Sequence, residues 1–176
     1  MARQPTKKQA KLATGSESHL YTLDVFIVSG PIARSFAKKN KVISRTIQIR
    51  GDQTLEELHL AIFSAFDREE EHMYEFQVGG KGPMDPEARR YVLDLYGHNA
   101  GPEGKAAGNV EETPIWSLGL KENEAFGYWF DFGDDWWHQI NVVAIEEQAG
   151  RGKYPKVTKR VGKSPPQYVD WDEEEE

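Results

Sequence analysis

The stretch FGYWFDFGDDWWHQI, residues 126–140, decides the fold because it reads as two strands joined by a tight turn. Successive side chains of a strand point to opposite faces, so the strand expected over 125–132 has two distinct sides. One side carries four aromatic rings and should face the core, since exposing them would create a large apolar patch. These rings belong to Phe126, Tyr128, Phe130 and Phe132. The other side carries Trp129 and Asp131.

The turn of this hairpin is predicted at Gly133, Asp134 and Asp135, residue types that bond to their own backbone in tight reversals. A second strand then runs from Trp136 to about residue 145. His138 shares a face of that strand with Trp136 and other apolar residues. Whether this is also the face of Asp131 depends on the hairpin register, which the sequence leaves open.

The remaining elements follow from periodicity. Strands are expected over 19–29, 41–49 and 72–79. The clearest helix covers 54–66, where Thr54 and Glu57 have the spacing of a capping box. Residues 80–114 are rich in glycine and proline and predict a long loop with one short element at 91–96. A short buried turn at 115–120 precedes the hairpin, and the chain beyond 146 should be largely extended.

The resulting order, β-β-α-β-loop-β-β, predicts an α+β fold in which an antiparallel-rich sheet carries one main helix on a face. This order is β-grasp-like by analogy, and such an analogy carries no function. We expect a flexible basic tail over 1–18, a single α+β domain over 19–150, and an extended basic segment with an acidic C-terminal tail over 151–176.

Composition narrows the class of protein. The net charge is −7, and residues 17–150 alone hold 12 basic and 23 acidic residues. No apolar run is long enough to cross a bilayer and no hydrophobic stretch follows the basic N-terminus, so we expect a soluble cytoplasmic protein without a membrane partner. The absence of cysteine excludes disulfides, thiolate zinc sites and cysteine nucleophiles.

The polar residues of the hairpin are the candidate site. Asp131, Asp135, His138 and the helix residue His59 are candidate catalytic groups, and Asp131, His138 and His59 are also candidate ligands of a divalent metal. The alternative is structural, because aspartate forms tight turns and a strand histidine beside tryptophan is commonly a packing residue. We predict binding roles for an exposed tryptophan, the turn and the strand-opening histidine. These binding residues are Trp129, Trp137, Asp134 and His72.

Nucleic-acid binding is a third hypothesis for the function. Residues 151–163 hold six basic residues and no acidic one, which could supply phosphate contacts. The other reading is a solvated segment that aids solubility. The chain has no phosphate loop, no G-x-S-x-G elbow, no H-E-x-x-H and no visible helix-turn-helix with a basic recognition helix.

Four segments together resemble the plasmid pRiA4b ORF-3-like family, some members of which carry a TnpR or resolvase-like label as passengers of insertion elements. The segments are TLEELHLAIFSAFD, HMYEFQVGG, FGYWFDFGDDWWHQI and YPKVTKRVGKSPPQY, within about 20–168. The resemblance implies an α+β fold and an uncharacterised function. The chain departs from the family pattern at Ile43-Ser44-Arg45-Thr46, where many members have Pro-x-Trp-Arg, and it lacks their cysteines near Pro165-Pro166.

A serine recombinase needs a nucleophilic serine among arginines, and Ser44 beside Arg45 is an isolated pair that we expect on the surface. Three functions therefore remain open. The first is a binding or accessory module that uses the hairpin to hold a protein partner. The second is a metal-dependent hydrolase of the phosphodiester type, and the third is nucleic-acid binding through 151–163. The sequence does not decide whether the protein is an enzyme or which cofactor it uses.

Overall fold

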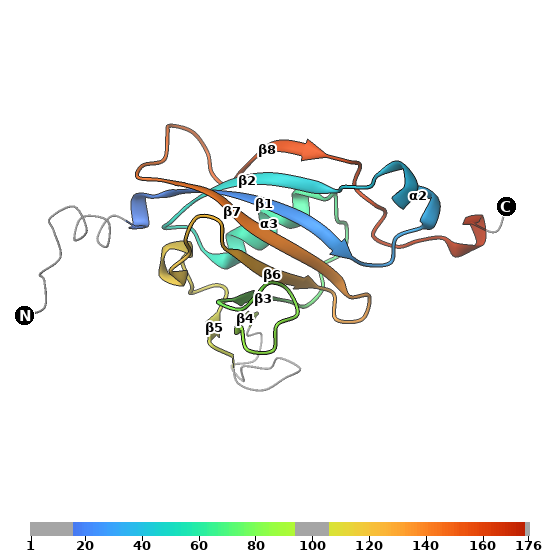
Figure 1. The fold of residues 1–176 in the computed structure, drawn as a ribbon, viewed down its shortest axis with the longest axis horizontal. Coiled ribbons are helices and arrows are strands. Elements are labelled where there is room, and N and C mark those ends of the chain that lie inside the picture. Colours follow the sequence, from blue (N-terminus) through green and yellow to red (C-terminus); the bar gives the residue numbers. More distant parts are fainter. Residues whose placement is uncertain (1–15, 94–105, 175–176) are drawn as a thin grey trace, which may run out of the picture.

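The computed structural model describes residues 16–93 and 106–174. In this part of the chain, one sheet of eight strands has the order β5-β4-β3-β6-β7-β1-β2-β8 (Figure 1). The strands are β1 (Leu20–Ser29), β2 (Ser44–Arg50), β3 (Tyr74–Val78), β4 (Arg89–Val92), β5 (Gly108–Asn109), β6 (Ala125–Phe130), β7 (Trp136–Glu146) and β8 (Lys156–Val161). Neighbouring strands are antiparallel except for β4 and β5, so the sheet is mixed. The predicted α+β class is confirmed.

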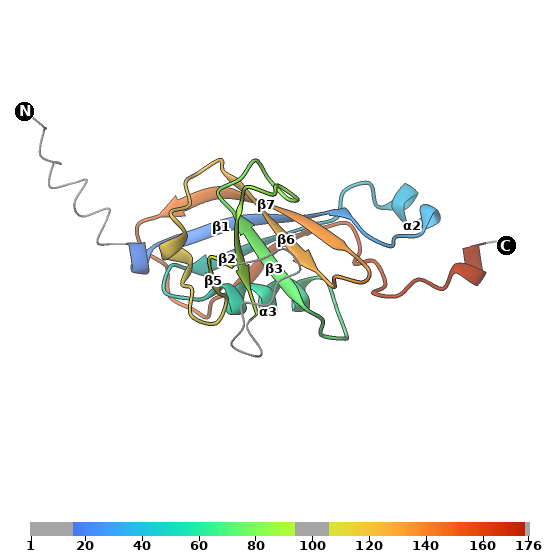
Figure 2. The same ribbon diagram turned by 90° about the horizontal axis from the view of Figure 1, so that it is seen from below.

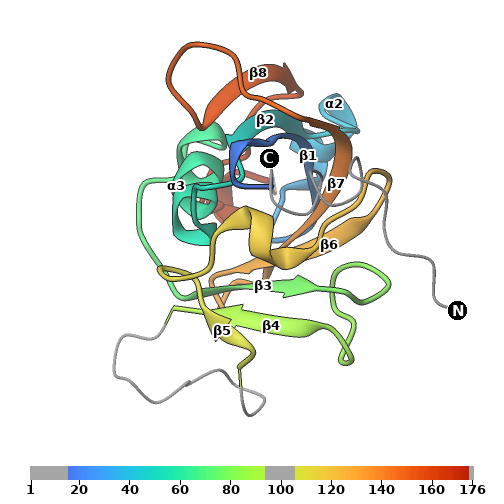
Figure 3. The same cartoon turned by 90° about the vertical axis from the view of Figure 1, so that its left-hand side faces the viewer.

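The helices are few. They are α2 (Arg34–Lys39), α3 (Leu55–Ala65), and the 3-10 turns η1 (Ser16–Ser18), η2 (Ile115–Leu118) and η3 (Trp171–Glu174). Seen end-on, the sheet curves around α3, which lies against one face (Figure 3). The buried side of α3 is its apolar stripe together with His59, and this stripe joins the core rings of β3, β6 and β7. None of the described helices is long and apolar enough to span a membrane.

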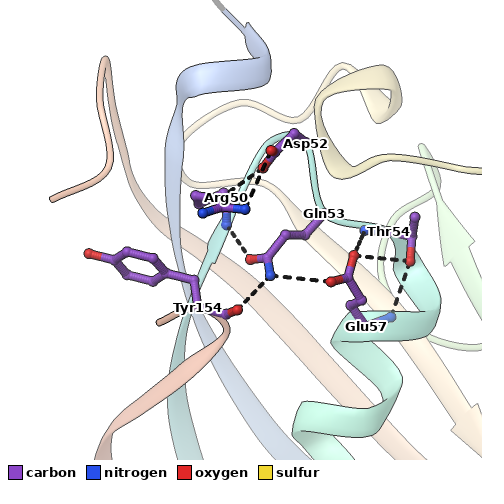
Figure 4. A network of polar contacts seen from close by, with 6 residues as sticks. All are labelled: Arg50, Asp52, Gln53, Thr54, Glu57 and Tyr154. Atoms are coloured by element: carbon purple, nitrogen blue, oxygen red, sulfur yellow. Dashed lines mark hydrogen bonds and ion pairs between the residues drawn. The ribbon is translucent and has the colours of Figure 1, made fainter. Parts of the chain in front are cut away.

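The start of α3 forms as the sequence predicts. The hydroxyl of Thr54 accepts a bond from the backbone N–H of Glu57, and the Glu57 carboxylate accepts one from the N–H of Thr54. Two of the helix's free N–H groups are thereby satisfied. The Gln53 side chain extends this network by donating to the Glu57 carboxylate and to the carbonyl of Tyr154 (Figure 4). The chain before β8 is therefore tied to the beginning of the helix.

The end of α3 is closed by a left-handed residue and by arginines from the sheet. Asp67 has φ 54°, and the N–H of Arg68 reaches back to the carbonyl of Phe63, which is the pattern of a Schellman motif. Arg45 on β2 donates to the carbonyl of Ala65 at 2.8 Å, and Arg160 on β8 donates to the same oxygen. These cations also favour the negative end of the helix dipole. Ser44 and Arg45 are buried, so the expectation that this pair lies on the surface is wrong.

Several elements differ from the sequence-based expectations. Helix α2 and strand β8 were not expected. In the predicted loop over 80–114, β4 overlaps the short element expected at 91–96, and the two-residue β5 was not expected. Strand β6 ends at Phe130 because Asp131 has φ 61°. The strict alternation stops there, so Phe132 leaves the core face and packs on Trp129 at 4.3 Å between ring centroids. Residues 1–15 of the tail predicted over 1–18, and residues 94–96 of the predicted short element, lie outside the described residues.

The hairpin register is now fixed. In the β6–β7 pair, Tyr128 lies opposite His138 and Trp129 lies opposite Trp137. His138 and Trp136 are therefore on the core face with Tyr128, and the two other tryptophans share the outer face. As predicted, His138, Trp136, Ile140 and Val142 share one face of β7, and all four are buried.

Candidate functional site

A groove of about 570 Å³ lies beside α3, along the chain that enters β3. Figure 2 shows α3 and β3 next to each other. Its lining combines carboxylates, two histidines and apolar side chains: Glu56, His59, Leu60, Glu71, His72, Met73, Tyr74, Leu93 and Glu111. Two histidines that were predicted as candidate site residues, His59 and His72, thus line the same groove.

His59 is held from three sides. Its Nδ1 lies 2.6 Å from the hydroxyl of Tyr128, and its Nε2 lies 3.0 Å from a carboxylate oxygen of Glu71. Because the carboxylate can only accept, the proton of the neutral ring belongs on Nε2 and Nδ1 accepts from the tyrosine. The ring stacks on Tyr74 at 3.6 Å with an interplanar angle of 3°. Burial lowers the pKa of His59, and the charge of Glu71 acts in the opposite direction.

His138 lies behind this arrangement rather than within the groove. Its ring is 4.9 Å from that of Tyr128, and Nδ1 is 3.3 Å from the Tyr128 carbonyl, which accepts the bond. Burial, followed by the positive charge of Arg68, lowers the pKa of His138 to about 3. His138 is therefore a neutral packing residue at ordinary pH, and Tyr128 separates it from His59.

His72 connects the groove to the hairpin turn and to the C-terminal segment. Its Nε2 lies 2.7 Å from the hydroxyl of Tyr168 and 3.4 Å from a carboxylate oxygen of Asp131. Tyr168 in turn donates to Glu70, and this bond is the main reason that the pKa of Tyr168 is raised to about 12. The backbone at Glu70 also donates to Gln167. The segment after β8 is thus fastened to the loop that precedes β3.

Two of the three aspartates of the hairpin, Asp131 and Asp135, have structural partners. One oxygen of Asp131 accepts bonds from the N–H groups of Gly133 and Asp134, at 3.0 and 3.2 Å. A carboxylate oxygen of Asp135 accepts from the indole N–H of Trp129 at 2.9 Å. Asp134 is exposed at the turn. Across residues 16–93 and 106–174, no group of three or more His, Asp or Glu side chains is placed to hold a metal ion.

The outer face of the hairpin carries a pair of stacked tryptophans. Trp129 and Trp137 lie 4.7 Å apart with an interplanar angle of 9°, and both are half-buried. The bond from Trp129 to Asp135 fixes the orientation of the pair. This pair and the groove lie on opposite sides of the sheet.

Two residues that sequence reasoning missed lie under the core face. The guanidinium of Arg68 sits 3.7 Å from the ring centroid of the fully buried Trp136, which is a cation–π contact. Burial lowers the pKa of Arg68 to about 10. Gly30 must be glycine here, because an added Cβ would lie 2.3 Å from the Trp136 ring. Arg68 follows a helix whose end could be read from the sequence, but no pattern in the sequence indicates its stacking partner.

The carboxylates of the groove were missed as well. Glu56 belongs to the first turn of α3, and its N–H donates to the carbonyl of Val110. This bond brings the neighbouring Glu111 to the same side of the groove. Partial burial, followed by the charge of Glu111 and a hydrogen bond with it, raises the pKa of Glu56. A contact between residues so far apart in the chain leaves no signal in a single sequence.

The basic segment, residues 151–163, includes strand β8. This strand lies at one edge of the described sheet and pairs with β2 on one side only. Lys156, Lys159 and Arg160 are exposed there. Charged side chains on an edge strand discourage pairing with other chains, which accounts for their presence without a ligand. Nucleic-acid binding through 151–163 stays a prediction.

Comparison with known proteins agrees with this architecture. A crystal structure of a protein of unknown function, MM3350 from Methanosarcina mazei Go1, superposes with a TM-score of 0.65 at 22% identity. The match covers 87% of this chain and 75% of that one, and at this identity it shows the fold alone. A search of curated proteins found no match. The family model for plasmid pRiA4b ORF-3-like proteins matches residues 34–171, so the chain belongs to the plasmid pRiA4b ORF-3-like protein family.

Proposed function

We propose that the protein is a binding module without catalysis of its own, and that its ligand occupies the groove between α3 and the start of β3. The observation that carries this proposal is the groove itself. Its volume of about 570 Å³ is in the range of small-ligand sites. Pockets of this kind pair an apolar lining with a few polar groups that orient the ligand.

The apolar part of the lining suits a ligand with an aliphatic body. Leu60 projects from α3 with half of its surface exposed, and Met73 and Leu93 border the groove. A half-exposed leucine on a helix gains free energy when a ligand covers it, because apolar surface leaves water. We therefore assign the apolar body of the ligand to these three side chains.

The polar groups near the hairpin favour binding over catalysis. Both ring nitrogens of His59 have partners, and the oxygens of Asp131 serve the turn and His72. His138 is fully enclosed behind Tyr128. A general base must reach the proton that it removes, and these groups already hold the protein's own structure.

The test uses six-carbon probes in an amide-resolved NMR titration. Hexylammonium, 1-hexanol and hexanoate share one aliphatic body and differ in their head groups. We expect at least one probe to shift the amide signals of Leu60, Met73 and Leu93 with millimolar affinity. Leu60→Gln should weaken that binding, and Val143→Thr, at an equally exposed apolar position on β7, should not. If no probe shifts the groove signals, the proposed function is wrong.

A second candidate function is docking of a partner protein on the outer face of the hairpin. The favouring observation is the Trp129–Trp137 stack, which is fixed by Asp135 and flanked by the exposed carboxylate of Asp134. An aromatic face beside negative charge suits an arginine side chain of the partner, which stacks on tryptophan and pairs with carboxylates.

This second function can be tested with a minimal probe, the peptide acetyl-Gly-Arg-Gly-amide. We expect it to shift the indole N–H signals of both tryptophans, and Asp134→Asn to weaken the effect. Replacement of the peptide's arginine by citrulline, which has the same shape without the charge, is the control. Equal shifts with citrulline would remove the arginine assignment.

A further inference from the structure

We propose that the groove binds the primary ammonium group of a small aliphatic amine, held by Glu56, Glu111 and the hydroxyl of Tyr74. This inference rests on the proposed function, because it names the head group of the ligand whose apolar body covers Leu60. Three observations point to it independently of one another.

The first observation is the Tyr74 hydroxyl. Tyr74 is only 2% exposed, it lines the groove, and its hydroxyl has no hydrogen-bond partner among the described residues. Buried hydroxyls nearly always have a partner, so this one calls for an explanation. The ring cannot turn freely to find one, because it stacks on His59. Burial, followed by the charges of Glu56, Glu71 and Glu111, raises the pKa of Tyr74, which keeps the phenol neutral.

The second observation is a pair of carboxylates that line the same groove as Tyr74. Burial, followed by the charge of the nearby Glu111, raises the pKa of Glu56, and Glu111 is held by a bond from its N–H to the side chain of Asn109. Two carboxylates in contact repel one another unless they share a proton or a cation lies between them. Glu71 differs from this pair, since its carboxylate already accepts a hydrogen bond from Nε2 of His59.

The third observation is the absence of a positive charge from the groove. Its described lining contains three glutamates and neither lysine nor arginine. The negative charge is therefore not balanced locally by the protein. A cation supplied by a ligand would meet that field in the groove that Tyr74 and the two carboxylates line.

The geometry favours an ammonium over other cations. An alkylammonium has three N–H donors and no acceptor, which matches one oxygen each from Glu56, Glu111 and Tyr74. A divalent metal does not fit, because no group of three metal-ligating residues occurs in the described chain. The volume of about 570 Å³ accommodates a whole small molecule, so we assign the head group to a free amine rather than to a lysine side chain of a partner protein.

The experiment compares hexylammonium with 1-hexanol and hexanoate by calorimetry and by NMR on the full chain. Hexylammonium should bind at least tenfold more tightly than hexanol, and hexanoate more weakly than either, because a charge-assisted bond is stronger than a neutral one. Glu56→Gln and Tyr74→Phe should each weaken hexylammonium several-fold and leave hexanol unchanged. Glu112→Gln, an exposed glutamate outside the groove, is the matched control.

The outcomes separate the two proposals. If hexanol and hexanoate bind in the groove as tightly as hexylammonium, and Glu56→Gln has no effect, the ammonium assignment is overturned and the proposed function stands. If no probe binds in the groove, both fall. A last arm uses lysine blocked as its acetyl and methylamide derivative: if it binds and hexylammonium does not, the ligand is a peptide and the free-amine assignment is wrong.

Discussion

The two faces of the β6–β7 hairpin both carry aromatic residues, but they differ in burial and in what these residues contact. The core face presents Tyr128, Trp136 and His138, all almost fully buried. Through the Tyr128 hydroxyl this face also fixes His59, and so supports the back of the groove. The outer face presents Trp129 and Trp137, half-buried and held by Asp135. One motif therefore supplies stability on one side and a rigid exposed aromatic surface on the other.

The difference shows why residue type alone does not identify a site. The histidine of the motif lies on the face where it has no access to a ligand. Two of its aspartates satisfy N–H groups of the turn and of an indole. The residues with unused binding capacity, Tyr74 and Glu56, lie outside the motif, on strands and helices that the hairpin packs against.

The largest expected difference between the faces comes from Trp136→Ala compared with Trp137→Ala. Trp136 is fully buried and stacks with Arg68, so its removal leaves a large cavity and an unpaired buried cation. We expect a loss of about 3–5 kcal/mol in the free energy of unfolding. Trp137→Ala should cost about 1 kcal/mol, since Trp137 is already partly exposed to water. Chemical denaturation measures both, and equal losses would refute the two-face description.

The second effect is a pH dependence of the free energy of unfolding, which arises from His138 on the core face. The pKa of His138 is lowered to about 3 in the folded protein, against about 6.5 in the unfolded chain. The unfolded state therefore binds the proton first, and stability should fall as pH drops below about 6.5, by up to ~1.4 kcal/mol per pH unit down to the folded pKa. The lowered pKa of His59 acts in the same direction.

His138→Gln should flatten this dependence, which denaturation at pH 7, 6 and 5 would measure. The outer-face variant Trp137→Phe changes no titratable group and serves as the control. An unchanged slope in His138→Gln would show that His138 is not the group that protonates on unfolding.

A smaller effect is expected at the turn that joins the faces. Asp131→Ala removes the acceptor of two N–H groups at a residue with φ 61°, a conformation that alanine disfavours. We expect a loss of about 1–2 kcal/mol in unfolding free energy. Asp131→Asn keeps an acceptor and tolerates the left-handed backbone, so it should lose less. Identical losses in the two variants would mean that the charge contact with His72 is the dominant contribution.

The smallest effect on stability belongs to Asp135→Gly. Asp135 is exposed and its bond to Trp129 lies at the surface. Glycine adopts its φ of 58° without strain, so the free energy of unfolding should change by no more than about 0.5 kcal/mol. The indole N–H of Trp129 should nevertheless exchange faster with solvent, which hydrogen-exchange NMR detects. A large loss of stability would show that the outer face also contributes substantially to the free energy of unfolding.

Local signals explain which parts of the fold were predictable. The capping box of α3 and the alternation of β6 involve residues within a few positions of one another. The capping box is confirmed, and the alternation is confirmed as far as Phe130. Strand β8 was missed because its polar sequence becomes a strand only through pairing with β2. Helix α2 was missed for a related reason, as it buries no side chain that would mark an apolar stripe.

The candidate site was predictable only in part. His59 and His72 could be named because histidines beside a helix and a strand start are conspicuous, and the groove does bring them together. Glu56 and Glu111 are ordinary surface glutamates in the sequence, and only the backbone bond from Glu56 to Val110 makes them neighbours. The unpartnered Tyr74 hydroxyl could not be predicted from the sequence either, because the absence of a partner depends on three-dimensional packing.

The central claim is that the groove beside α3, rather than the aromatic outer face, is the small-ligand site. Titration of the full chain with hexylammonium, followed by NMR, tests it most directly. We predict saturable shifts of the signals of Leu60, Met73 and Tyr74, with the indole signals of Trp129 and Trp137 unchanged. Shifts confined to the two tryptophans, or no saturable shift at all, would contradict it.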